Sequence, residues 1–279
     1  MLSTYAVAPT KAFPYERTVD PAATSNVGGA DRNHAAVYAD SISSIELSDN
    51  REPYGVAVSP DGKRVYVTTL FSGTVEVIDT ATNSVVTSVR VGGITTGVSV
   101  TPDGKYLYIG ESHGHIYAMN TATFALTTVI ASANYPGKDV AVTPDGRYLY
   151  ALDNVFNEIL VIRTGNHAIA ATITLEQAPQ SITIARSSGL AYVGTDTDST
   201  APSGSITVID TAIHMIVDTI PLVDGVKSVI LSSDENHVYA VTDTATVALD
   251  TETHTVAHLS EPLQTSTLER RGVKPSIGA

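Results

Sequence analysis

One pattern returns at a nearly constant interval through most of this chain. A Tyr recurs at spacings of 42, 42, 42 and 47 residues, at Tyr66, Tyr108, Tyr150, Tyr192 and Tyr239. Eight residues before each Tyr stands an aliphatic residue, and later in each unit a Thr follows the end of an aliphatic run. A period of this length is typical of stacked supersecondary units that bury their apolar faces against one another.

The repeated units have the composition of β-strands. The first unit contains the runs GVAVSP, RVYVTT, TVEVID and SVVTSVRV, which are rich in β-branched residues and are separated by turn sequences such as Pro60-Asp61-Gly62. Four short strands in about 42 residues predict one blade of a β-propeller. The Tyr residues themselves are explained by packing between neighbouring sheets, without any ligand.

The repeats also predict how the chain is divided. Five full repeats occupy approximately 51–92, 93–133, 134–176, 177–222 and 223–260, and a half-blade begins at His34. We expect the half-blade to be completed by Tyr5–Ala8, by Glu261–Leu268 or by both, because propellers close by combining strands from the two chain ends. The prediction is an all-β propeller of four-stranded blades over residues 34–268. Six blades are favoured over five or seven, with an N-terminal arm at 1–33 and a tail at 269–279.

At this level of detail the chain resembles the YVTN-type β-propeller repeat family. The resemblance is carried by GVAVSPDGKRVYVTT and VEVIDTATN in the first repeat, and by VSVTPDGKYLYIG and VAVTPDGRYLYAL in the next two. It implies a propeller fold but no single activity, since members of the family include surface-layer and binding proteins and relatives of lyase and lactonase-like enzymes. Lactonase-like propellers hold a divalent ion at the channel mouth. This implies Mg²⁺ or Ca²⁺ as a cofactor to test, with Glu52, Asn154 and Asp196 as the positions to inspect.

Charge and composition exclude some classes of partner. The chain has 29 acidic and 16 basic residues, for a net charge of −13, which repels phosphate backbones and anionic lipid surfaces. We therefore expect neither nucleic acid nor membrane as a partner. There is no cysteine, and no signal segment or membrane span is visible. We expect a cytoplasmic protein, or a secreted one if a signal segment has been removed.

The expected strand order places the irregular loops at one end of the propeller. If each innermost strand runs from top to bottom, the regular Pro-Asp-Gly and Asp-Thr-Ala-Thr turns lie at the bottom. The connections between blades and the loops between second and third strands then lie at the top. Variable loops on a constant scaffold are where binding and catalytic residues usually occur.

The sharpest local cluster of the top face is Glu111-x-His113-x-His115. Alternating residues of a strand point the same way, so this carboxylate and two imidazoles could converge on a metal ion or a substrate proton. The alternative is a polar loop, because Gly114 indicates a turn. We do not assign a metal site from this pattern alone.

Two lysines of this sequence are expected at the entrance of innermost strands, next to the central channel. Lys138, with Asp139 beside it, and Lys227 could fix an anionic group or act in acid–base chemistry, and the alternative is an ion pair of Lys138 with Asp139 or Asp153. The candidate catalytic residues are accordingly Glu111, His113, Lys138, Asp153 and Lys227. The candidate ligand-binding residues, which also include aromatic and amide side chains of the top loops, are Arg51, Glu52, Tyr54, His115, Tyr135, Asp139 and Asn154.

Two functions remain open from the sequence. One is a binding or interaction propeller that recognises a small molecule or a protein partner through its top loops. The other is an enzyme, of a lyase, cyclase or lactone hydrolase type, that uses the Lys, His, Glu and Asp residues of the channel mouth. No serine hydrolase, zincin, P-loop or dinucleotide-binding motif is present.

Overall fold

The repeats form five four-stranded antiparallel sheets. The computed structural model describes residues 5–6, 44–45, 47, 52–131, 137–197 and 203–259, and this part of the chain contains strands and turns but no helix. Within each sheet the strands follow one another in sequence order, so that every sheet is a simple meander. The described part of the chain therefore also contains no helix that could span a membrane.

Each sheet corresponds to one predicted repeat, and its bounds agree with the prediction. The first sheet consists of β3 (Pro53–Val58), β4 (Arg64–Thr69), β5 (Thr74–Asp79) and β6 (Ser84–Arg90). The second consists of β7 (Thr95–Val100), β8 (Tyr106–Glu111), β9 (His115–Asn120) and β10 (Leu126–Ala131). The third consists of β11 (Gly137–Val142), β12 (Tyr148–Asp153), β13 (Glu158–Arg163) and β14 (Ile169–Thr174). The fourth consists of β15 (Ala178–Ile184), β16 (Leu190–Asp196), β17 (Gly204–Asp210) and β18 (Met215–Leu222). The fifth consists of β19 (Val226–Leu231), β20 (His237–Thr242), β21 (Thr246–Asp250) and β22 (Val256–Leu259).

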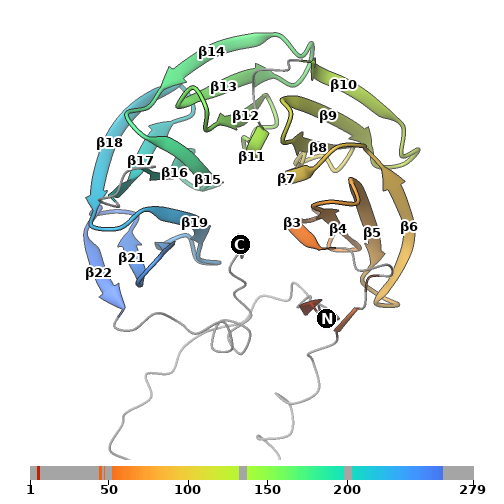
Figure 1. Ribbon diagram of the computed structural model, residues 1–279, viewed down its shortest axis with the longest axis horizontal. Helices are drawn as coiled ribbons and strands as arrows, with labels where there is room; N and C mark the ends of the chain where they lie inside the picture. Colours follow the sequence, from red (N-terminus) through yellow and green to blue (C-terminus); the bar gives the residue numbers. More distant parts are fainter. Residues whose placement is uncertain are drawn as a thin grey trace, which may run out of the picture.

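The five sheets stand as blades around a common axis. Figure 1 shows their first strands, β3, β7, β11, β15 and β19, innermost and their fourth strands outermost. This arrangement confirms the predicted all-β propeller of four-stranded blades. The predicted number of six blades depends partly on residues outside the described ranges, among them 7–43 and 260–279, and stays a prediction.

The predicted strand near the N-terminus is present. β1 (Tyr5–Ala6) pairs antiparallel with β2 (Ser44–Ile45) in a two-stranded sheet of its own, and the completion of the half-blade stays a prediction. Ile45 is buried against Val65, Val67 and Ile78 of the first sheet, as a residue of a preceding blade would be. The other proposed closing strand, Glu261–Leu268, lies outside the described residues.

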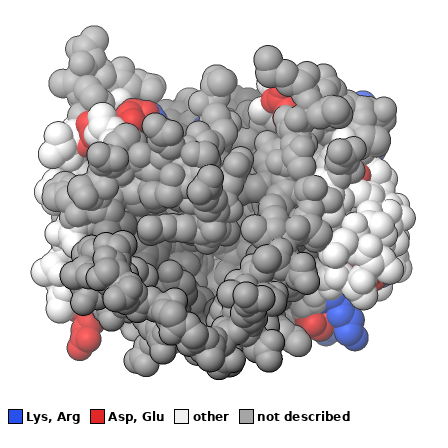
Figure 2. All heavy atoms as spheres, turned by 90° about the horizontal axis from the view of Figure 1, so that it is seen from below, with Lys and Arg blue, Asp and Glu red and all other residues white. Residues whose placement is uncertain are grey.

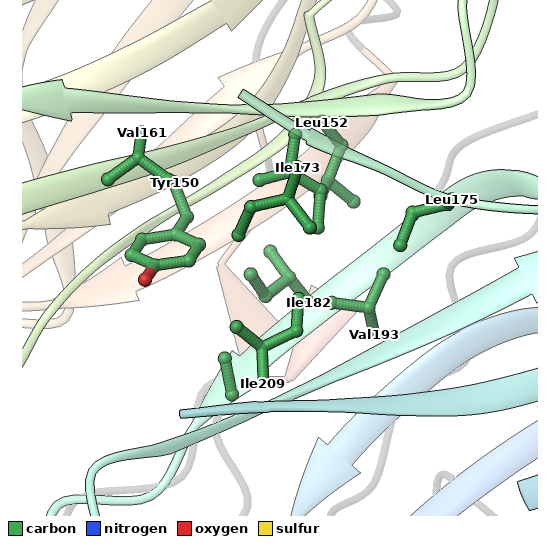
Figure 3. Close-up of a cluster of buried hydrophobic side chains, with 10 residues drawn as sticks. Tyr150, Leu152, Val161, Ile173, Leu175, Ile182, Val193 and Ile209 are labelled. Carbon is green, nitrogen blue, oxygen red and sulfur yellow. The ribbon is translucent and has the colours of Figure 1, made fainter. Parts of the chain in front are cut away.

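The core lies between neighbouring blades, in the places where the repeat predicts it. In the cluster of Figure 3, Tyr150 and Leu152 of the third sheet pack with Ile182 and Val193 of the fourth. Tyr150 and its equivalents at 66, 108 and 192 are at most 1% exposed. Burying an aromatic side chain of this size stabilises a fold by roughly 1.5–3 kcal/mol, so these residues hold successive blades together.

Three of the repeated Tyr residues contact a His of the next blade. The Tyr150 hydroxyl lies 2.6 Å from His214 Nδ1, whereas the Tyr108 hydroxyl lies 3.5 Å from His167 Nε2. Tyr192 makes an edge-to-face ring contact with His254, and its buried hydroxyl has no hydrogen-bond partner among the described residues. His254 Nδ1 is instead bonded to Asp218, at 2.6 Å.

The turns at the lower end use one hydrogen-bond pattern with one exception. In the first blade Ser59 Oγ donates to Asp61 Oδ1 at 2.6 Å, and the second, third and fifth blades repeat this bond with their own Ser or Thr. The fourth blade has no such Asp. There the backbone N–H groups of Arg186 and Ser187 donate to the carboxylate of Glu235 from the fifth blade, at 3.1 and 2.8 Å.

All five innermost strands contain an irregularity in strand pairing near their upper ends. The register shifts lie between Pro53 and Val56, Thr95 and Val98, Gly137 and Val140, Pro179 and Ser181, and Val226 and Ser228. Such bulges redirect side chains and often occur next to functional sites. Here the bulge residues of the first, third, fourth and fifth blades lie at the mouth of the central channel, whereas that of the second blade, Thr96, is buried.

Candidate functional site

A cavity of about 680 Å³ lies on the axis of the propeller and is lined by the innermost strands of all five sheets. This volume is in the range typical of small-molecule sites. The walls are mostly aliphatic side chains, glycine and small hydroxyl residues. Its charged lining residues are Lys138, Asp139, Arg186 and Lys227.

The upper end of the cavity is formed by one repeat position. Twelve residues before each repeated Tyr, inside the bulge, stand Tyr54, Thr96, Lys138, Gln180 and Lys227. All of these except Thr96 line the cavity, and Thr96 is 5% exposed, with its hydroxyl donating to the carbonyl of Gly137. The predicted channel-mouth residues Tyr54, Lys138 and Lys227 are therefore brought together by the fold.

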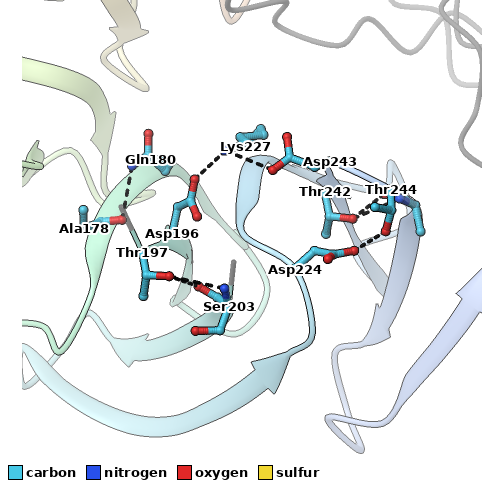
Figure 4. Close-up of polar contacts among 11 residues, drawn as sticks. Ala178, Gln180, Asp196, Thr197, Ser203, Asp224, Lys227, Thr242, Asp243 and Thr244 are labelled. Carbon is cyan, nitrogen blue, oxygen red and sulfur yellow. Dashed lines mark hydrogen bonds and ion pairs between the residues drawn. The ribbon is translucent and has the colours of Figure 1, made fainter. Parts of the chain in front are cut away.

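Lys227 is paired with two carboxylates. Its Nζ lies 2.5 Å from Asp196 Oδ2 of the fourth blade and 3.3 Å from Asp243 Oδ2 of its own blade (Figure 4). The hydrogen bond that Lys227 donates to Asp196 is the main reason why the pKa of Lys227 is raised above its usual value. Gly225 is required beside this pair, because a Cβ there would collide with the Asp196 carboxylate. Lys227 is thus held as a charged ammonium group.

Lys138 occupies the same repeat position but has no ion-pair or hydrogen-bond partner among the described residues. Neither of the predicted ion pairs, with Asp139 or Asp153, is formed. Its side chain is partly buried in the cavity wall. Its charge lowers the pKa of the neighbouring Asp139 without forming an ion pair, so the N–H donors of the ammonium remain available to a ligand.

Asp139 is turned toward the fourth blade. Its Oδ1 accepts the N–H of Val140 at 2.9 Å, and its Oδ2 accepts the N–H of Ile182 at 3.1 Å. Burial nevertheless raises the pKa of Asp139 to about 6, against the lowering effect of these hydrogen bonds. Gly97 makes room for this carboxylate, because a Cβ there would lie 2.6 Å from Asp139 Cα. Asp139 therefore links two blades and also faces the cavity.

Tyr54 contributes a phenol to the same cavity from the first blade. Burial, followed by the negative charge of Asp139, raises the pKa of Tyr54 to about 12. The hydroxyl therefore remains protonated at neutral pH and can donate a hydrogen bond to a ligand.

Glu111, His113 and His115 converge on one another rather than on the cavity. Glu111 Oε1 lies 2.6 Å from His113 Nδ1, and its Oε2 lies 3.1 Å from His115 Nδ1. Glu111 ends β8 and His115 begins β9, with Gly114 at φ 95° in the turn, so strand alternation does not apply and the hairpin itself brings the three together. Burial raises the pKa of Glu111, but the hydrogen bonds outweigh it and the pKa lies below its usual value.

Asp153 also bonds to its own hairpin. Its Oδ1 accepts the N–H groups of Val155 and Phe156 at 2.9 and 3.0 Å. Thr69 and Thr195 occupy the same repeat position and bond locally in the same way. Neither Glu111, His113 nor Asp153 lines the cavity. The five candidate catalytic residues are thus divided between the cavity and two hairpins.

The remaining candidates lie at the rim or outside the described residues. Glu52 is exposed and Asn154 is partly buried, and neither lines the cavity. Arg51 and Tyr135 lie outside the described residues. Within the described ranges no group of three or more His, Asp or Glu side chains is arranged to hold a metal ion. The Mg²⁺ or Ca²⁺ suggested by the family resemblance stays a prediction.

The charged residues that line the cavity are mostly cationic, and one of them, Lys227, is paired with two carboxylates. On the face drawn in Figure 2, Asp and Glu side chains and a Lys or Arg group lie at the edges of the view, and the whole chain has a net charge of −13. The cavity, in contrast, is lined by three cationic residues and one carboxylate. Sequence analysis missed two of these features, Arg186 as a lining residue and the Asp196–Lys227–Asp243 ion pairs. The second could have been found by comparing the positions that follow each repeated Tyr.

Comparison with known proteins supports the fold. No protein-family model matches the sequence, and no curated protein matches it significantly. Similar solved structures include hydrazine synthase from Kuenenia stuttgartiensis, with a TM-score of 0.69 and 19% identity over 78% of this chain and 68% of that one. They also include a 6-phosphogluconolactonase candidate from Bacteroides uniformis ATCC 8492, with a TM-score of 0.62 and 12% identity over 79% of this chain and 73% of that one. Both neighbours are propellers, and at these identities the likeness concerns the fold alone.

Proposed function

We propose that this protein is a binding propeller of the YVTN-repeat type that takes a small molecule into the cavity on its axis. The observation that carries the proposal is the cavity itself, about 680 Å³ in volume and lined by all five innermost strands. At its upper end it combines a phenol, an amide and an unpaired ammonium group with aliphatic walls. The lining of the cavity is about evenly divided between polar and apolar surface, and a concave site of this size with several converging polar groups is typical of small-molecule sites.

A blocking substitution tests whether ligands use this cavity. Val56 lines the cavity and is 54% exposed, so a Val56→Trp side chain can enter the cavity without displacing core residues. Val86, on the outermost strand β6, is 51% exposed and does not line the cavity, which makes Val86→Trp a matched control. A fragment set of small acids, amides and alcohols is screened by ligand-observed NMR against the unsubstituted protein and both variants. We expect Val56→Trp to abolish the binding that Val86→Trp retains. Fragments that bind equally to both variants, or no binding fragments at all, would refute the proposal.

An enzymatic function of the same cavity is the second candidate. It is favoured by Asp139, whose carboxyl has a pKa of about 6 beside the Lys138 ammonium and opposite the Tyr54 phenol. Groups with perturbed pKa values in a cavity are common among catalytic acids and bases. An enzyme of this kind would lose turnover in Asp139→Asn while keeping ligand affinity, whereas a binding protein would show no turnover in either form.

A further inference from the structure

The two cavity lysines stand at one repeat position but in different electrostatic surroundings. Lys138 precedes Tyr150 by twelve residues, and Lys227 precedes Tyr239 by the same number. Lys227 forms ion pairs with two carboxylates. Lys138 forms no ion pair with any described residue. Because the backbone is repeated, the difference must come from the neighbouring side chains.

Those neighbours occupy the position four residues after each repeated Tyr. For Lys227 they are Asp196 of the preceding blade and Asp243 of the same blade. The corresponding residues around Lys138 are Ser112 of the second blade and Asn154 of the third. The two places that carry compensating charge at Lys227 are therefore neutral at Lys138. The ammonium of Lys138 therefore lacks these two carboxylates. The charge of the neighbouring Asp139 acts on it without an ion pair, because the Asp139 oxygens accept the N–H groups of Val140 and Ile182.

The other cationic lining residue is too far away to share a small ligand. Arg186 lies six residues after Gln180, beyond the lower end of β15, which places the two about 20 Å apart along the axis. A small molecule held at Lys138 does not span that length. The positive charge that it meets is a single ammonium, with Gln180 on the adjoining innermost strand.

We propose that the cavity binds a small organic carboxylate whose anionic head group is held by Lys138 and Gln180. The inference rests on the proposed function and assigns its ligand class. The amide of Gln180 donates to the carbonyl of Ala178 at 3.4 Å through one N–H, and its second N–H is available (Figure 4). One ammonium and one amide donor match the two oxygens and single charge of a carboxylate. A phosphate monoester, with nearly two charges, would require a second uncompensated cation.

The test compares probes that differ only in the head group. Benzoate, benzamide and phenyl phosphate are titrated into the full chain at low ionic strength, with binding followed by NMR shifts. We expect benzoate to bind more tightly than benzamide or phenyl phosphate. Lys138→Met should weaken benzoate by about ten- to a hundred-fold, the loss typical of a charged hydrogen bond, and should leave benzamide unchanged. Arg186→Met removes the same charge from the other end of the cavity and should change benzoate affinity by less than about twofold.

A second variant keeps Lys138 but gives its ammonium group carboxylate partners within the protein. Ser112→Asp with Asn154→Asp gives Lys138 the two carboxylates that Lys227 has, and should weaken benzoate as strongly as Lys138→Met does. Both positions are partly exposed at the rim, so the fold is expected to survive, which circular dichroism checks. This variant separates the loss of an available charge from the loss of a side chain.

The outcomes distinguish this inference from the proposed function. If benzamide binds as well as benzoate, and Val56→Trp abolishes both, the cavity binds small molecules but the carboxylate assignment is overturned. Tighter binding of phenyl phosphate overturns it too, in favour of a phosphate ligand. Benzoate binding that survives Lys138→Met overturns the role of Lys138. If no probe binds, the carboxylate class is overturned, and the fragment screen decides the proposed function on its own.

Discussion

The repeated Tyr residues allow one substitution to be tested in two settings that should respond in opposite directions. Tyr150 and Tyr192 are both fully buried at the same repeat position. The hydroxyl of Tyr150 is bonded to His214 at 2.6 Å, whereas the hydroxyl of Tyr192 has no hydrogen-bond partner within the part of the chain that the structure describes. Phe removes the hydroxyl at either position and leaves the packing of the ring unchanged.

The magnitudes follow from these two environments. Loss of a typical hydrogen bond lowers the free energy of unfolding by about 1 kcal/mol, so Tyr150→Phe should destabilise the protein by that amount. A buried hydroxyl without a partner costs about 1–3 kcal/mol in mutational data, so Tyr192→Phe should raise the free energy of unfolding by about 1 kcal/mol or more. The two variants should therefore differ by about 2 kcal/mol, or roughly 4–8 °C in Tm for a chain of this size.

Urea denaturation at pH 8, followed by circular dichroism, measures the difference. The pKa of His214 is lowered by burial and by Arg163, so the imidazole is neutral at this pH and can accept the bond from Tyr150. Tyr108→Phe is the control, because its hydroxyl makes only long contacts of 3.4 and 3.5 Å and its loss should have a small effect. If Tyr192→Phe destabilised the protein as much as Tyr150→Phe, the hydroxyl environments described above would be wrong.

Three further predictions concern the cavity wall and the lower turns. Burial raises the pKa of Asp139 to about 6, so the stability contributed by its protonated carboxyl is greatest below pH 4 and is lost as the pH rises through 6. In a series of urea midpoints measured at different pH values, Asp139→Asn should remove this loss of stability. Gly97→Ala should destabilise the protein by about 2 kcal/mol or more, since its Cβ would meet Asp139, whereas Gly165→Ala, with nothing within 4 Å, should stay within about 0.5 kcal/mol in the same assay. Glu235→Ala removes both acceptors of the fourth lower turn and should lower the free energy of unfolding by about 1–3 kcal/mol; an unchanged Tm would show that those two bonds are not needed.

The fold could be predicted because its determinants are local and repeated. Turn residues such as Asp61 and β-branched runs fix each hairpin, and the interval between successive Tyr residues fixes the blade. The same logic also led to a correct interpretation of Tyr66 and its equivalents as packing residues. The repeat pattern does not predict the contacts between neighbouring blades, because a contact such as that of Tyr150 with His214 joins side chains of two different repeats. These contacts are tertiary and leave no periodic signal of their own.

The candidate site was predictable only in part, for a related reason. Lys138 and Lys227 were placed at the channel because their position in the repeat determines their direction. The sequence also predicts Glu111 and His113 at the top of a blade. It does not show that these two side chains form a hydrogen bond with each other within their own hairpin. The raised pKa of Asp139 depends on burial between two blades, which no single repeat reveals.

The bulges of the innermost strands have a consequence for how this protein could acquire new specificity. Four of the five bulges orient a side chain at the mouth through the backbone, and these blades carry Tyr, Lys, Gln and Lys on that shared geometry. A residue can therefore be exchanged at one blade while the hydrogen bonding of its strand is left intact. Substitutions could therefore change the chemistry of the mouth blade by blade, with each change largely independent of the others.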